Sequence, residues 1–399
     1  MPLALPPLVD HHCHGVLRHG PDVEGFASYL TESDAPAAPG TSFFDTQLGF
    51  AVRRWCPPLL GLEAHCPPER YLERRRELGS AESTSRLLRA SGTGMYLVDT
   101  GLPGDLTGPT ELAELGGGEA HAIVRLESLA ERTADASHDP LTFLEVFDHA
   151  VTASARTAAG FKSIAAYRYG LGLEPDPPTP AEVHQAASRW LEERPPGGRL
   201  TDPVLLRHLL WSAVRTGLPL QLHTGFGDPD LRLDRCDPLL LTAFIRAVAP
   251  YGCPLVLLHG YPYHRHAAYL AHVFTHVYAD VGLALSHTGA RAGAVLAEAL
   301  ELTPFGKLLY SSDAFGLPEL YVVGARVFAE ALERLLDTWT SSGAWSDEDA
   351  GRVAHLLAAG NARRLYGLVT GEPRGGEDGP VSRPGPPAPG PAAAPGGTR

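Results

Sequence analysis

Three histidines stand within four consecutive positions near the start of the chain, in the stretch LVDHHCHGVL that covers residues 8–17. His12 and His14 are two residues apart, so in a β-strand they face the same side, and His11 is expected to face the other. Two neutral imidazoles on one face suit Zn²⁺ and related divalent ions. The alternative is a polar strand end whose histidines only form hydrogen bonds, and this pair alone does not decide between the two roles.

The same arrangement recurs later in the chain, where single polar residues close apolar runs. His223 ends LQLH, His259 ends VLLH and Asp313 ends LLYSSD, and each is followed closely by glycine or another small residue. If these runs are parallel strands, their carboxyl ends lie at one face of the fold. The recurrence favours one shared metal site over a set of unrelated structural residues.

Eight apolar runs of strand length alternate with helical patterns along the chain. Their apolar character is continuous, which is typical of a parallel sheet covered on both faces by helices. Eight such units predict an α/β fold, a (β/α)₈ TIM barrel, with a doubly wound open sheet as the alternative. The predicted strands are residues 8–12, 95–99, 120–126, 161–166, 218–223, 254–259, 276–281 and 308–313.

Two segments depart from this alternation. Residues 18–80 separate the first two strands by far more than a helical return, and TESDAPAAPG and RRWCPPLL within them read as irregular. We expect this insertion to form a lid over the catalytic mouth of a barrel spanning residues 1–370. Residues 371–399 are rich in Pro and Gly, so we expect a disordered, dispensable tail that cannot offset its ordering entropy.

Composition restricts the partners and the compartment. The net charge of −13 and the lack of a Lys/Arg-rich run argue against a nucleic-acid or anionic-membrane partner. We find no signal-peptide pattern and no run of about 18 apolar residues. The five cysteines show no CxxC pairing, which fits a reducing compartment. We therefore expect a cytoplasmic protein with a small-molecule substrate, and a homo-oligomer remains open.

These motifs resemble those of the amidohydrolase superfamily of metal-dependent hydrolases, in its amidohydrolase-related branch. The chain is also similar to the amidohydrolase-like half of the fluG and nodulin–glutamine synthetase fusions. The resemblance covers roughly residues 5–368 and rests on His-x-His after strand one, single histidines after strands five and six and an aspartate after strand eight. The stretch GNARRLYGL, residues 360–368, is similar to the helix that ends many members.

The resemblance implies a divalent metal, with Zn²⁺ first and Mn, Fe or Ni as alternatives, held by His12, His14, His223, His259 and Asp313. Many members use a carboxylated lysine on strand four to bridge two ions, and Lys162 stands in that strand here. The alternative is that Lys162 stands too early in the strand to reach the mouth, and a single ion is then the simpler case. The number of ions, one or two, is therefore left open at this point.

Four further residues are weaker candidates for contact with substrate. Arg168 follows strand four and could bind a carboxylate, or form a structural ion pair. Tyr167 precedes it and could line the pocket. Glu127 follows strand three and is either a site residue or the partner of Arg125, and His287 is either a substrate contact or an exposed loop residue.

Together the residues and the resemblance predict a hydrolase that attacks a small amide with water activated by the metal. Asp313 is the expected proton acceptor, and His259 would hold the ion or polarise the scissile carbonyl. A carboxylate-bearing or γ-glutamyl-type amide is favoured by Arg168 and by the fusions to glutamine synthetase-like domains. The rivals are a non-oxidative decarboxylase and a non-catalytic scaffold or regulatory barrel.

Overall fold

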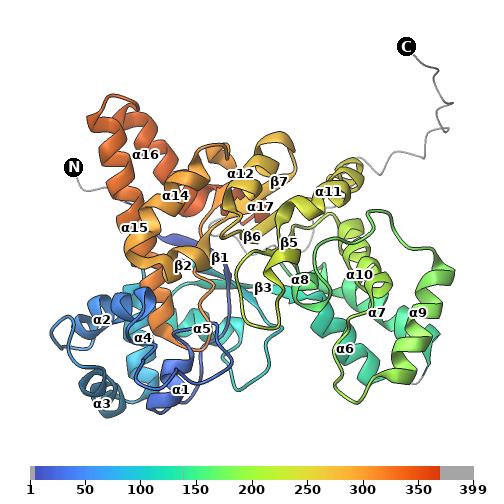
Figure 1. Cartoon of the computed structure of the whole chain (residues 1–399), viewed down its shortest axis with the longest axis horizontal. Coiled ribbons are helices and arrows are strands. Elements are labelled where there is room, and N and C mark those ends of the chain that lie inside the picture. The colour runs from blue at the N-terminus through green and yellow to red at the C-terminus, as the bar shows by residue number, and fades with distance from the viewer. Residues whose placement is uncertain (1–4, 138, 369–399) are drawn as a thin grey trace, which may run out of the picture.

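Eight parallel strands form a nearly closed barrel at the centre of the molecule (Figure 1). The computed structural model describes residues 5–137 and 139–368. Each strand pairs in parallel with the next along the chain, from the first to the eighth. The strands are β1 (Leu8–Cys13), β2 (Thr93–Asp99), β3 (Glu119–Arg125), β4 (Gly160–Ser163), β5 (Leu220–Thr224), β6 (Leu255–His259), β7 (Val277–Asp280) and β8 (Leu308–Leu309).

The first and last strands meet through backbone hydrogen bonds that lie beyond the short β8. The N–H of His11 donates to the carbonyl of Tyr310, and the N–H of Asp313 donates to that of His12. The (β/α)₈ prediction is therefore confirmed. Strand eight is shorter than predicted, because only Leu308–Leu309 pair with β7 and Asp313 lies in the loop that follows.

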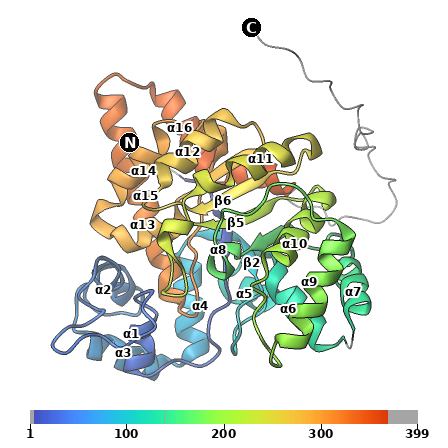
Figure 2. The same cartoon turned by 45° about the vertical axis from the view of Figure 1, so that its right-hand side comes forward.

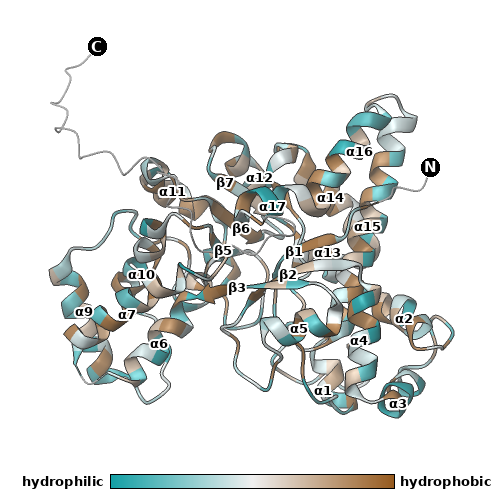
Figure 3. Cartoon of the chain, turned by 180° about the vertical axis from the view of Figure 1, so that it is seen from behind, coloured by the Kyte–Doolittle hydropathy of each residue, from teal (hydrophilic) through white to brown (hydrophobic). Residues whose placement is uncertain are grey.

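Helices surround the barrel and cover the outward faces of its strands. Alternate strand residues fill the interior, among them Val9, Leu97 and Val256, while their neighbours pack against the helices. The strands are mostly white to brown in Figure 3 and the outer helices carry the teal residues. The helices are α1 (Val23–Ser28), α2 (Gln47–Leu59), α3 (Pro68–Leu78), α4 (Ser80–Ala90), α5 (Pro109–Gly116), α6 (Leu126–Asp135), α7 (Pro140–Ser154), α8 (Ala165–Arg168), α9 (Pro180–Glu193), α10 (Pro203–Thr216), α11 (Thr242–Val248), α12 (His264–Val273), α13 (Gly282–Thr288), α14 (Ala292–Leu300), α15 (Pro318–Ser341), α16 (Asp347–His355) and α17 (Asn361–Tyr366).

The segment between β1 and β2 is more regular than predicted. It holds α1 to α4, of which α1 to α3 lie on one side of the barrel in two views, with α6, α7, α9 and α10 on the other (Figures 1 and 2). RRWCPPLL was expected to be irregular and is instead the second half of α2. Pro57 cannot donate to Arg53 in a helix, but the carbonyl of Arg53 accepts from His65 N at 2.7 Å. A neighbouring loop thus replaces the bond that proline removes.

The terminal segment GNARRLYGL closes the end of the barrel opposite the carboxyl ends of the strands. Ala362 and Tyr366 pack against the interior residues Val9, Leu97 and Val256. The expected tail, residues 371–399, and residues 369–370 of the predicted barrel lie outside the described residues. Within the described residues, no helix is long and apolar enough to cross a membrane.

Candidate metal centre

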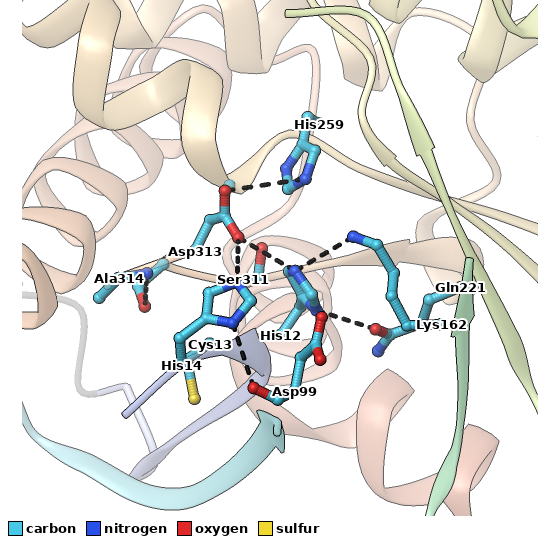
Figure 4. Close-up of polar contacts among 12 residues, drawn as sticks. His12, Cys13, His14, Asp99, Lys162, Gln221, His259, Ser311, Asp313 and Ala314 are labelled. Carbon is cyan, nitrogen blue, oxygen red and sulfur yellow. Dashed lines mark hydrogen bonds and ion pairs between the residues drawn. The ribbon is translucent and has the colours of Figure 1, made fainter. Parts of the chain in front are cut away.

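His12 and His14 stand at the carboxyl end of β1 with the same edge of each ring turned toward Asp313. The Nε2 atoms of His12 and His14 lie 3.0 and 3.3 Å from Asp313 Oδ1. The opposite nitrogen of each ring faces an acceptor: Nδ1 of His12 is 2.9 Å from Gln221 Oε1, and Nδ1 of His14 is 3.2 Å from the carbonyl of Asp99. Figure 4 shows the two rings converging on the same carboxylate. Both rings are thus held by outer partners, with Nε2 directed to a common point.

His11 does not point away from this cluster as predicted. The pairing of β1 with β2 is irregular between Asp10 and Cys13, and this shift changes the alternation of side chains. The His11 ring therefore lies deeper in the barrel, with Nε2 3.1 Å from Asp280 Oδ2. Asp10 takes the outward place and accepts from the backbone N–H of Ser312 at 2.9 Å.

Two of the converging residues have backbone conformations that non-glycine residues rarely adopt. His259 has φ 67° and Asp313 has φ 51°. Each is held by a buried carboxylate nearby: Asp280 Oδ1 accepts from His259 N at 3.0 Å, and Asp10 binds the residue before Asp313. Strained backbone that the surroundings enforce is common at functional sites. The fold therefore fixes these two side chains in place.

His223 and His259 extend the cluster from the ends of β5 and β6. Their ring centroids are 4.7 Å apart, and His259 Nε2 lies 3.7 Å from Asp313 Oδ2. His223 Nε2 and His259 Nδ1 are buried and have no hydrogen-bond partner among the described residues. A buried imidazole nitrogen without a partner is costly, and a bound ion would satisfy the one on His223.

Burial keeps the imidazoles in the form that binds metal. It lowers the pKa of His12 to about 3, and it lowers the pKa of His223 and of His259 below the usual histidine range. Burial alone would raise the pKa of Asp313, but the surrounding histidines outweigh it and hold that pKa well below its usual range. At neutral pH His12, His223 and His259 are therefore neutral imidazoles, and Asp313 is a carboxylate.

This donor set fits a divalent cation. One ligand atom from each of His12, His14 and Asp313 can be chosen so that all lie within 4.8 Å of one another. Ligands at about 2.0–2.1 Å from Zn²⁺ in a tetrahedron are roughly 3.3 Å apart, close to the separations of 3.0 and 3.3 Å found here. Two acceptor atoms at such a distance need a cation or a proton between them.

Lys162 reaches this cluster from β4, contrary to the concern that it is placed too early in its strand. Its Nζ lies 3.3 Å from His12 Nε2, and the side chain is fully buried. No carboxylate among the described residues forms an ion pair with it. Burial lowers the pKa of Lys162 to about 8, which makes the neutral amine accessible near neutral pH.

If Lys162 is carboxylated and bridges two ions, Lys162→Ala should lower the metal content of the purified protein from two ions per chain toward one. The amine lies beside His12, where a carboxylated lysine could hold a second ion. Metal analysis of both proteins after identical loading measures this ratio. Lys307→Ala is a control, since Lys307 is a half-buried lysine that donates to the backbone carbonyl of Phe274. An unchanged ratio in Lys162→Ala would leave a mononuclear site.

A cavity of about 1140 Å³ opens above the cluster. Part of its wall comes from the segment between β1 and β2, through residues 28–29, 31–34 and 48. Tyr167, Arg168 and His287 also line it, as predicted for residues at the mouth. The Tyr167 ring lies 4.4 Å from that of His223, centroid to centroid, and His287 Nε2 is 3.4 Å from Glu32 Oε1.

Arg168 is only partly paired. One terminal nitrogen lies 3.1 Å from Glu131 Oε1, whereas its buried Nε has no partner among the described residues. The side chain is 9% exposed. The structure thus contains the ion pair considered as the alternative, and Arg168 also lines the cavity.

Glu127, a candidate for contact with substrate, does not line the cavity, and its carboxylate is used in contacts within the protein. Its Oε1 accepts from Ser163 Oγ at 2.6 Å and from the N–H of Ile164 at 3.0 Å. The carboxylate is fully buried and joins the end of β3 to the turn after β4. Arg125, its expected partner, is held by Asp99 Oδ2 at 2.6 Å.

The sequence reasoning missed three residues around the cluster: Asp99, Gln221 and Asp280. Asp99 and Asp280 end β2 and β7 as Asp313 follows β8, so the rule that found Asp313 could have found them. Gln221 lies two residues before His223 and therefore faces the same side of β5. The presence of a glutamine within an apolar run was the feature of the sequence that could have identified Gln221 as a site residue.

Comparison with known proteins places these residues in a family. The family model described as amidohydrolase matches residues 99–368. Protein fluG of Emericella nidulans is 33% identical over 222 residues, which are 52% of this chain and 25% of fluG. The chain thus spans about a quarter of the length of that curated relative.

Solved structures agree in fold. A protein from Lactobacillus casei ATCC 334, provisionally assigned as a metal-dependent hydrolase, is 30% identical with a TM-score of 0.80, over 91% of this chain and 95% of that one. A uronate isomerase from Bacillus halodurans C-125 is 15% identical with a TM-score of 0.60, over 91% and 93%, and shares the fold alone. With the family model matching most of its length, the chain belongs to the amidohydrolase family.

Proposed function

We propose that this protein is a metal-dependent hydrolase that cleaves the C–N bond of a small, carboxylate-bearing amide. The observation that supports it most directly is the convergence of His12, His14 and Asp313 below a cavity of about 1140 Å³. His223 adds a buried imidazole nitrogen without a partner among the described residues. The family and the provisional assignment of the Lactobacillus casei protein favour hydrolysis.

His12, His14, His223 and Asp313 would hold the ion, with His259 and Lys162 beside them. A divalent ion at this place, Zn²⁺ in our proposal, supplies Lewis acidity that lowers the pKa of water toward about 7 and polarises a carbonyl. The Asp313 carboxylate accepts the proton of the attacking water at Oδ2, the oxygen nearer His259, and returns it to the leaving nitrogen. His259 Nε2, 3.7 Å from that oxygen, would orient the carboxylate or hydrogen-bond to the scissile carbonyl.

The proposed substrate class rests on Arg168. Its guanidinium lines the cavity and is 9% exposed, and a guanidinium in such a place can bind a carboxylate. Its bond to Glu131 holds the side chain in position without using every donor. The narrower choice of a γ-glutamyl-type amide rests on the resemblance to the fusion proteins.

The test is a substrate screen with the full chain loaded with Zn²⁺ or Mn²⁺. The panel contains N-acyl and γ-glutamyl amides, the same amides without a carboxylate, and aromatic carboxylic acids as decarboxylation substrates. Release of amine from carboxylate-bearing amides is the expected result. Release of CO₂ alone would make the protein a decarboxylase, and no turnover by fully metallated protein would favour a scaffold.

We expect Arg168→Gln to raise KM for carboxylate-bearing amides by roughly 10- to 100-fold, the usual effect of losing a hydrogen bond to a charged group. The metal ligands are untouched, so kcat should change much less. The matched measurement uses an analogue in which a carboxamide replaces the carboxylate, and its KM should not change. An equal loss on both substrates would assign Arg168 a structural role through Glu131.

A further inference from the structure

Gln221 connects the metal cluster with the closed end of the barrel. Gln221 belongs to β5, and its side chain has no exposed surface. Oε1 is 2.9 Å from Nδ1 of His12, while Nε2 is 2.8 Å from the carbonyl of His11 and 2.9 Å from the hydroxyl of Tyr366. All the strong contacts of the amide therefore lead to β1 or to the terminal helix α17 (Figure 4 shows the contact with His12).

The chemistry of these partners permits only one orientation of the amide. A backbone carbonyl can only accept, so the group that faces the carbonyl of His11 must be the NH₂ of Gln221. Its second hydrogen is directed to the oxygen of Tyr366, and both donors are used. The carbonyl oxygen of the amide consequently faces His12, and Nδ1 of His12 must carry the hydrogen.

Protonation of Nδ1 determines the state of the other ring nitrogen. In a neutral imidazole the second nitrogen, Nε2, then holds a lone pair, and in His12 this atom points to Asp313 Oδ1 at 3.0 Å. Partners that fix the tautomer of a ligating histidine strengthen metal binding. His14 obtains the same tautomer from the backbone carbonyl of Asp99, which no substitution can remove.

We propose that Gln221 is a positioning residue that fixes the ligating tautomer of His12, and that Tyr366 of α17 holds the Gln221 amide in the required orientation. The inference rests on the metal centre used by the proposed function. It gives the terminal stretch GNARRLYGL a role beyond packing, since Tyr366 extends inward and its hydroxyl lies 2.9 Å from Nε2 of Gln221.

The first experiment reads the wild-type protein, and a variant serves only to assign its signals. Two-dimensional ¹⁵N–¹H NMR of Zn²⁺-loaded protein labelled in histidine, with the His12 signals assigned by loss in His12→Gln, reports which ring nitrogen is protonated. A His12 ring protonated at Nδ1 is the expected result. Protonation at Nε2 in the wild-type protein would overturn the proposal, whatever the enzyme's activity.

The second experiment measures metal affinity by competition with a chromophoric chelator, using Zn²⁺ alone as the probe. Gln221→Leu should weaken binding by about 10- to 100-fold, the usual effect of losing an outer partner of a ligating histidine. Asn361→Leu is the matched control, because it also removes a fully buried amide with two hydrogen bonds to backbone carbonyls. It should lower the thermal midpoint while leaving the affinity unchanged.

The outcomes separate the proposals. Equal affinity in wild type and Gln221→Leu would refute the role of Gln221 and leave the metal centre intact. Wild-type protein that binds no Zn²⁺ would refute the metal centre and the proposed function with it. Loss of affinity in Asn361→Leu equal to that in Gln221→Leu would show a general effect of stability.

Tyr366→Phe should weaken Zn²⁺ binding less than Gln221→Leu, because the bond from Gln221 to the carbonyl of His11 persists. An unchanged dissociation constant for Zn²⁺ would remove Tyr366 from the proposal.

Discussion

Asp313→Asn is expected to lower turnover by at least about 10²-fold while the protein keeps its fold and most of its metal. The amide of asparagine cannot accept the proton of the attacking water, whereas its remaining oxygen can still serve as a ligand. The backbone also tolerates the change, because Asn adopts the left-handed conformation of this position, φ 51°, at least as readily as Asp. The substitution therefore changes the chemistry of the site more than its structure.

The measurement compares turnover on the best substrate of the screen, with metal content and thermal midpoint determined for both proteins. Asp135→Asn is a suitable control, since Asp135 lines the rim of the same cavity, is 45% exposed and pairs with Arg194. It should keep turnover near the wild-type value. Undiminished turnover in Asp313→Asn would remove Asp313 from the mechanism. The other role open to Asp313, capping the next helix, is already excluded, because Leu317 occupies the N-cap of α15.

Glu319→Ala should lower the free energy of unfolding by about 3–5 kcal/mol, the range for removing one partner of a buried ion pair. Glu319 lies in α15 with no exposed surface, and its Oε1 accepts from Arg75 Nε at 2.7 Å and from the hydroxyl of Tyr71 at 2.8 Å. Removing the carboxylate leaves the guanidinium of Arg75 buried without its counter-charge. Both donors belong to α3, so the loss should also loosen the segment that walls the cavity.

The same helix provides the control. Glu330 of α15 pairs with Arg54 of α2 at 2.8 Å, but the Arg54 side chain is 44% exposed. Glu330→Ala should cost no more than about 1 kcal/mol, as exposed pairs do. Denaturant titration of the three proteins gives the free energies. Equal costs for the two variants would show that the buried pair does not anchor α3.

The residues that converge at the metal centre were predictable because one rule places them. Continuous apolar runs form parallel strands, and the carboxyl ends of parallel strands in a barrel lie on one face. His12, His14, His223 and His259 occupy such ends, and Asp313 follows β8. Topology alone therefore predicts that these side chains lie close together, without knowledge of any individual contact.

Two predictions of local structure failed because residues distant in sequence alter the local pattern. His11 was assigned to the wrong side because strict alternation holds only for a regular strand, and the pairing of β1 with β2 shifts between Asp10 and Cys13. RRWCPPLL was assigned as irregular because Pro57 breaks a helical hydrogen bond, yet His65 supplies a donor from outside the helix. Neither compensation is visible in the local sequence.

What the sequence alone determined is the barrel and the set of side chains at its mouth, because apolar periodicity and strand order depend on residue types along the chain. The tertiary structure decided which partner each polar group takes. In the structure Arg125 forms an ion pair with Asp99, and Glu127 accepts a hydrogen bond from Ser163. Gln221 lies between His12 and Tyr366 and forms hydrogen bonds with both. Such pairings depend on distances of about 3 Å between atoms up to hundreds of residues apart, and directional hydrogen bonds distinguish partners only at that range.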